Sequence, residues 1–65
     1  MTKHYSVSLT TNTATYTTTV GWGSEEGTVD EYRLAMRAVS RIYDEDGFDL
    51  SPLRWDIAIE ELEVA

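Results

Sequence analysis

The sequence predicts an α+β domain: a three-stranded antiparallel sheet, with strands in the order 2-1-3, carrying one helix on one face. Three patterns support this fold. Residues 3–10 and 13–22 alternate between apolar and polar side chains, residues 28–47 have a helical period, and residues 55–59 alternate again. A right-handed crossover through the helix places the third strand beside the first. A chain of 65 residues has room for one such ββαβ domain, spanning 1–65.

The first two strands are predicted to form a hairpin with a tight turn at residues 11–13. Asparagine tolerates a positive φ angle, so we expect Asn12 to adopt one there. With any two-residue loop, Leu9 of the first strand lies on the same face as Val20 of the second. The opposite face carries serine and threonine and is expected to stay open.

The helix has sequence signals at both ends. Thr28 followed by Glu31 is a capping box, in which the threonine hydroxyl accepts from a main-chain N–H and the glutamate reaches back. Gly47 can adopt the left-handed conformation that ends a helix. Three acids in the last turn oppose the helix dipole, so we expect this end to fray.

The apolar arc of the helix covers roughly 220°, about twice the stripe that one sheet needs. We expect the surplus at Leu34 and Ala38 to be available to a partner. Arg33, Arg37 and Arg41 share the remaining arc at four-residue spacing. We interpret them as a solvated face that neutralises neighbouring acids, with a basic stripe for phosphate as the alternative.

Two segments flank the helix. Residues 21–27 are predicted to be a flexible loop with Trp22 packed at the sheet edge. For residues 52–64, the alternation of apolar side chains favours a strand over a C-terminal helix. A bulge at residues 60–61 would return Leu62 and Val64 to the inner face.

The composition argues against several classes of function. Five basic and twelve acidic residues give a net charge of −7, which disfavours direct binding to nucleic acid and points to a basic protein surface as the partner. The chain has no cysteine and a single histidine, His4. We therefore expect no catalytic residues, no metal site and no cofactor. No apolar run reaches the length of a membrane span, so we expect no membrane contact and a cytoplasmic location.

The acids fall into groups near both ends of the helix and on the last strand. Carboxylates spaced in this way can occupy a groove built for phosphates, because duplex DNA carries one charge per about 1.7 Å of its axis. Solubility alone is the alternative role for these acids. The residues predicted to contact a partner are Glu25, Glu26, Asp30, Glu31, Asp44, Asp46, Glu60 and Glu61.

The whole chain resembles the small acidic proteins that bacterial viruses make to disable host nucleic-acid machinery, particularly anti-CRISPR proteins and the short RNA polymerase inhibitors of podoviruses. The resemblance rests on length, acidity, absence of cysteine and the order of the segments YSVSL, ATYTTTVGW, TVDEYRLAMRAVSRIY and RWDIAIEELEV. It implies a phage-encoded, non-enzymatic inhibitor in the cytoplasm of a host bacterium. Such a protein would dock on a basic surface of a CRISPR effector complex or polymerase. No individual residue role follows from the resemblance.

The alternative is a small structural or regulatory module that self-associates. It would use the surplus helix face or the uncharged open edge at residues 15–20, so the chain could be a monomer or a homodimer. An enzyme acting on a small ligand is the third hypothesis, and it requires a convergent pocket that the sequence does not indicate.

Overall fold

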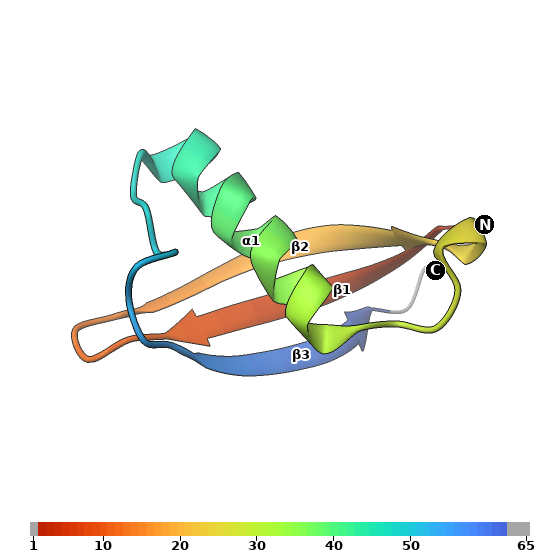
Figure 1. Cartoon of the computed structure of the whole chain (residues 1–65), viewed down its shortest axis with the longest axis horizontal. Helices are drawn as coiled ribbons and strands as arrows, with labels where there is room; N and C mark the ends of the chain where they lie inside the picture. Colours follow the sequence, from red (N-terminus) through yellow and green to blue (C-terminus); the bar gives the residue numbers. More distant parts are fainter. Residues whose placement is uncertain (1, 63–65) are drawn as a thin grey trace.

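The computed structural model describes residues 2–62 as three strands, one α-helix and one short 3-10 helix (Figure 1). The three strands form one antiparallel sheet in the order β2-β1-β3, with α1 lying across one face. This confirms the predicted fold, including a strand at the C-terminal end. The elements along the chain are β1 (Thr2–Thr10), β2 (Thr15–Gly23), η1 (Ser24–Glu26), α1 (Glu31–Asp46) and β3 (Asp56–Leu62).

β1 is the central strand, and its inner face forms the floor of the core. Leu9 pairs with Tyr16 of β2 and with Ile57 of β3, so the three side chains lie on the same face of the sheet. Val7 and Leu9 are completely buried. None of the described helices is long and apolar enough to cross a membrane.

The hairpin turn is closed by a threonine hydroxyl and not by a left-handed asparagine. No non-glycine residue among those described has a positive φ angle, so the prediction for Asn12 is wrong. The Thr11 N–H donates to the Ala14 carbonyl at 2.8 Å, and the Thr11 hydroxyl accepts from the N–H groups of Thr13 and Ala14 at 3.3 and 3.2 Å. Because this hydroxyl binds the turn's N–H groups, the turn needs no positive φ angle.

α1 begins two residues later than predicted. Its N-cap is Asp30, whose carboxylate accepts from the N–H groups of Tyr32 and Arg33 at 2.9 and 3.4 Å, so Thr28 is not the cap. Aspartate is the stronger capping residue, and its charge also favours the positive end of the helix dipole. At the other end Gly47 has φ 69° and its N–H donates to the Tyr43 carbonyl, as predicted.

The centre of the apolar arc of α1 faces the sheet, and the margins of the arc do not. Leu34 and Ala38 are 0% exposed, so the prediction that they remain available to a partner is wrong. Tyr32 and Tyr43 lie at the margin of the arc and are 64% and 55% exposed. The periodicity gives the width of an apolar arc but not its direction, and tyrosines at the margin can keep their hydroxyl groups in water.

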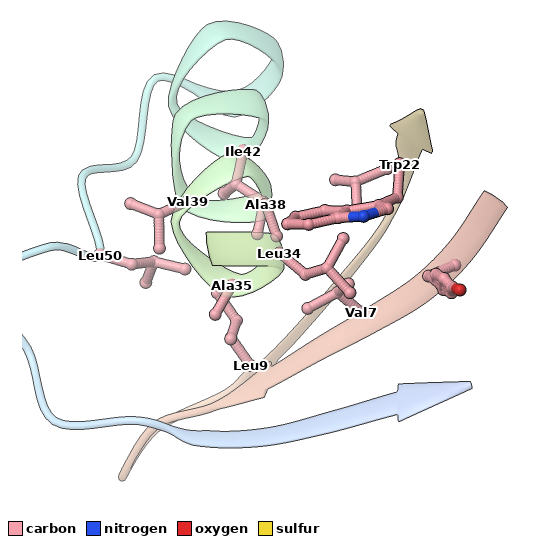
Figure 2. Packing of buried hydrophobic residues seen from close by; sticks show 11 residues of the cluster. Val7, Leu9, Trp22, Leu34, Ala35, Ala38, Val39, Ile42 and Leu50 are labelled. Atoms are coloured by element: carbon pink, nitrogen blue, oxygen red, sulfur yellow. The ribbon is translucent and has the colours of Figure 1, made fainter. Parts of the chain in front are cut away.

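A second segment completes the core beside α1. Residues 47–55 return from the end of the helix to the sheet, and Leu50 is completely buried. Trp22 and Leu50 approach α1 from opposite sides (Figure 2). The Phe48 ring stacks on Tyr16 with centroids 5.4 Å apart, and the Trp55 indole N–H donates to the Leu50 carbonyl at 3.1 Å. The helix alone does not enclose the core, because α1 packs mainly on β2 and β1.

β3 pairs with β1 without interruption, so the predicted bulge at residues 60–61 is wrong. In this register Leu62 lies on the outer face and Glu61 on the inner face, which α1 covers only in part. The carboxylate of Glu61 is stabilised there by Lys3, with Nζ and Oε1 3.2 Å apart. Val64, which was predicted to return to the inner face, lies outside the described residues.

Truncation at the centre of α1 should destabilise the protein far more than truncation at its margin. Leu34→Ala removes a fully buried side chain and is expected to lower the free energy of unfolding by about 2–5 kcal/mol. Tyr32→Ala, on the exposed margin, should change it by no more than about 0.5 kcal/mol. Urea denaturation followed by circular dichroism measures both. Equal effects would contradict the observed direction of the apolar arc.

Removal of the Thr11 hydroxyl should weaken the hairpin. Thr11→Val keeps the shape of the side chain but loses the acceptor for two N–H groups, so a loss of about 1 kcal/mol is expected. Thr11→Ser retains the hydroxyl and should lose less. The same denaturation experiment compares the two variants, and identical curves for Thr11→Val and the native chain would show that water replaces the hydroxyl without cost.

Candidate functional site

The eight acids predicted to contact a partner do not form one surface. Three of them are engaged within the chain: Glu26 with Arg37, Asp30 as the cap of α1, and Glu61 with Lys3. The other five are exposed and make no hydrogen bond or ion pair with any described residue. These five are Glu25, Glu31, Asp44, Asp46 and Glu60.

The five exposed acids lie in three places. Glu25 in η1 and Glu31 in the first turn of α1 both lie on the N-terminal side of the helix. Asp44 and Asp46 are in the last turn of α1, toward the opposite end. Glu60 is on the outer face of β3, because it pairs with Ser6 of β1. One flat partner surface therefore cannot contact all five at once.

The acids in the last turn of α1 carry an energetic cost. The carbonyl end of a helix is the negative end of its dipole, and the last turn of α1 contains no basic residue. Arg41 and Glu45 form an ion pair at 3.1 Å, but Asp44 and Asp46 have no described partner. Acids at such positions cost about 0.3–1 kcal/mol each. The fold thus gives no reason for their presence.

Glu26 is held on the edge of the sheet. Its carboxylate binds the Arg37 guanidinium through both oxygens, with Oε2 3.0 Å from Nη1, and Oε2 also accepts from the Gly23 N–H at 2.8 Å. The hydrogen bond from Arg37 and the one from Gly23 lower the pKa of Glu26 from 4.5 to about 2. Glu26 is therefore part of the fold, and it is not free to contact a partner.

Arg37 completes this arrangement on the side of α1. Its Nη1 donates to the Gly21 carbonyl at 2.7 Å, and its guanidinium lies 4.8 Å from the centroid of the Trp22 ring. The Trp22 indole N–H donates to the Gly27 carbonyl at 3.0 Å. We call Arg37 and Glu26, bound to Gly21 and Gly23, the edge clamp.

The edge clamp replaces two sequence predictions. Residues 24–26 form the 3-10 helix η1 instead of a flexible loop, because Glu26 anchors them to Gly23 and Arg37. Arg37 and Arg41 neutralise acids, as predicted, by pairing with Glu26 and Glu45. Arg37 is only partly exposed, however, so it does not belong to a fully solvated arginine face. Glu26 and Arg37 are eleven positions apart on different elements, and no helical or strand period links them.

The cavity beside the start of β1 is lined by no histidine and no carboxylate among the described residues. It has a volume of about 410 Å³ and is lined by Lys3, Tyr5, Trp22, Ser24, Gly27, Thr28 and Val29. Lysine and tyrosine are its only titratable groups. His4 lies on the outer face, between Gly21 of β2 and Leu62 of β3. Among residues 2–62, no cluster of three or more histidine or carboxylate side chains could hold a metal ion.

The outer face of the sheet carries serine and threonine hydroxyl groups along β1 and β2. Ser8 and Thr17 are hydrogen-bonded across β1 and β2 at 3.0 Å, and Thr10 and Thr15 at 3.2 Å. No described element covers this face (Figure 1). The open face predicted from the sequence is therefore observed, and along β2 it is polar without being charged.

The edge clamp should make stability depend on acid pH. A carboxyl group with a lower pKa in the folded chain stabilises the fold above pH 4.5, and this contribution is lost as the pH falls toward 2. Glu26→Gln should therefore flatten the profile of unfolding free energy between these values. Glu60→Gln makes the same change of charge away from Arg37 and should leave this part of the profile in place. Urea denaturation at a series of pH values tests this, and equal slopes for the two variants would refute it.

No protein-family model, curated protein or solved structure matches this chain. The resemblance to small acidic viral inhibitors therefore stays a prediction from the sequence, and no residue role comes to this chain from a relative. The function has to be argued from the positions and charges of its own side chains.

Proposed function

We propose that this chain is a non-enzymatic, phage-encoded inhibitor that docks acidic side chains on a basic, nucleic-acid-binding surface of a host complex such as a CRISPR effector. It acts in the cytoplasm of the host bacterium and needs no cofactor. Binding blocks the surface that would otherwise hold nucleic acid, either by occupying phosphate positions or by steric exclusion. The net charge of −7 supports a basic partner and disfavours nucleic acid itself.

The observation that carries this proposal is the pair of unpartnered acids in the last turn of α1. Asp44 and Asp46 oppose the helix dipole and have no partner among the described residues. A residue that destabilises its own helix is better explained by a contact outside the chain. Asp44 and Asp46 are therefore the centre of the proposed docking surface.

The geometry narrows the set of acids that can share one interface. α1 has 16 residues and spans about 24 Å at 1.5 Å per residue. A partner that contacts both Glu31 at the start of α1 and Asp46 at its end must therefore have a large surface. Glu60 lies on the opposite face of the sheet and is excluded from that interface. Glu26, Asp30 and Glu61 serve the fold.

Such a docking surface acts mainly through long-range attraction. Complementary charge raises the rate of association and makes it depend on salt, because dissolved ions screen exposed charges beyond about 10 Å at 0.1 M. Exposed pairs contribute about 0.2–1 kcal/mol each. Tight inhibition therefore requires several acids to act together, with the exposed Tyr43 beside them as an apolar contact.

Neutralising Asp44 and Asp46 should weaken partner binding without harming the fold. The double variant Asp44→Asn and Asp46→Asn removes two acids from the negative end of the helix, so its stability should be unchanged or higher. Its affinity for a partner captured from nuclease-treated bacterial lysate should fall roughly 2- to 30-fold, mostly through slower association.

The control is Glu60→Gln, which makes a similar change of charge on the outer face. Interferometry with the purified partner, at low and high salt, compares the variants. A short DNA duplex in excess should displace the native chain if the surface is one that holds nucleic acid. Binding that is unaffected by salt, by the double variant and by the duplex would disprove acidic docking.

A further inference from the structure

The two edges of the sheet are protected to different degrees. β3 forms one edge and carries Asp56, Glu60 and Glu61, and charged side chains on an edge discourage pairing with another chain. β2 forms the other edge, and its nine residues, TYTTTVGWG, include no charged residue and no proline. Natural sheets rarely leave a long, uncharged edge open. β2 therefore has the properties of an interaction edge.

The register shows which main-chain groups point outward from β2. In an antiparallel pair, alternate residues direct both N–H and C=O toward the partner strand or away from it. The Thr11 N–H donates to the Ala14 carbonyl, so this pair is hydrogen-bonded and the next pair, Thr10 with Thr15, is not. By this alternation Thr15, Thr17 and Thr19 direct their N–H and C=O groups to the open edge.

The edge clamp confirms this alternation and limits the open segment. Arg37 donates to the carbonyl of Gly21 and Glu26 accepts from the N–H of Gly23, which are the next outward-pointing residues of β2. The clamp thus occupies the edge where another strand would otherwise bind. At the other end of β2 the open edge stops at the hairpin turn, whose last residue is Ala14. The unsatisfied part of the edge is the segment from Thr15 to Thr19.

We propose that a second copy of this chain pairs with β2, antiparallel and about a two-fold axis at Thr17, so that two sheets join into one. Thr17 then faces Thr17 of the second copy, and Thr15 faces its Thr19, each pair exchanging two main-chain hydrogen bonds. The hairpin turn of each copy then lies opposite the edge clamp of the other copy, so the ladder uses the whole open segment. The ladder itself uses only main-chain groups of β2, and among the acids proposed to dock on a partner only Asp44 lines the cavity beside it.

The chemistry of the edge fits a second copy because the edge is self-complementary. The spacing Thr15-x-Thr17-x-Thr19 is symmetric about its centre, so every outer-face pair is threonine with threonine, which is a favourable cross-strand pair. Because these positions carry no charge, no like charges of the two copies face each other within the ladder.

The inner side of the same edge is also suited to a symmetric contact. A cavity of about 500 Å³ lies between β2 and α1, lined by Val20, Gly21, Met36, Arg37, Ser40, Arg41 and Asp44. This wall carries both signs of charge, with Arg41 and Asp44 close in sequence on α1. A two-fold axis can place opposite charges across the interface, whereas a wall of one sign would repel its copy.

Charges placed at Thr17 test both the interface and its axis. Thr17→Glu and Thr17→Lys each put two like charges opposite one another on the axis, so each variant alone should sediment as a monomer where the native chain is a dimer. An equimolar mixture pairs Glu with Lys and should recover the dimer. Both variants lose the hydroxyl contact with Ser8, so recovery in the mixture rules out that loss as the cause.

The matched control is Ala58→Glu, on the same exposed face at the other edge of the sheet, since Ser8 pairs with both Thr17 and Ala58. This variant should remain a dimer. Sedimentation velocity over a dilution series measures all five samples. A native chain that stays monomeric at its highest soluble concentration would overturn the proposal, as would a dimer of Thr17→Glu, dissociation by Ala58→Glu, or a mixture that stays monomeric.

Discussion

The structure depends on the burial of one strand face beneath one helix. β1 is central, and Val7 and Leu9 are closed off by Leu34, Ala35 and the segment that contains Leu50. A single helix is narrower than a three-stranded sheet, since helices are about 10 Å across and strands lie about 4.8 Å apart. α1 therefore covers β2 and β1, and the chain uses residues 47–55 to close the rest. The partial cover of β3 follows from this arrangement.

The sequence predicted the elements well because each has its own period. Alternation in β1, β2 and β3 and the helical period of α1 identified the elements, and the right-handed crossover rule then gave the strand order. Prediction failed where two chemical solutions compete at the same place. Thr28 and Asp30 can both cap a helix, and the carboxylate does so here. Asn12 and Thr11 can both make a turn, and the hydroxyl does so here.

The candidate site was less predictable, because a count of acids does not show which of them the fold uses. Glu26 and Glu61 looked equivalent to their neighbours Glu25 and Glu60 in the sequence, yet each binds a group within the chain. Glu31 was predicted to support the helix cap, but Asp30 provides the cap instead. Glu26 and Arg37 meet only after α1 has packed across β2. Interactions between distant elements of this kind have no local pattern, so only the fold could reveal the edge clamp.

The edge clamp affects how readily molecules of this protein associate in mild acid. Its isoelectric point is about 4.3, and near that pH the repulsion between molecules disappears and association is favoured. An exposed strand edge is then a site at which molecules can pair and aggregate. Here Glu26 keeps its charge at that pH, because its pKa is about 2, so Gly21 and Gly23 stay occupied. The edge clamp therefore still blocks this part of the β2 edge at the pH where the general repulsion between molecules is absent.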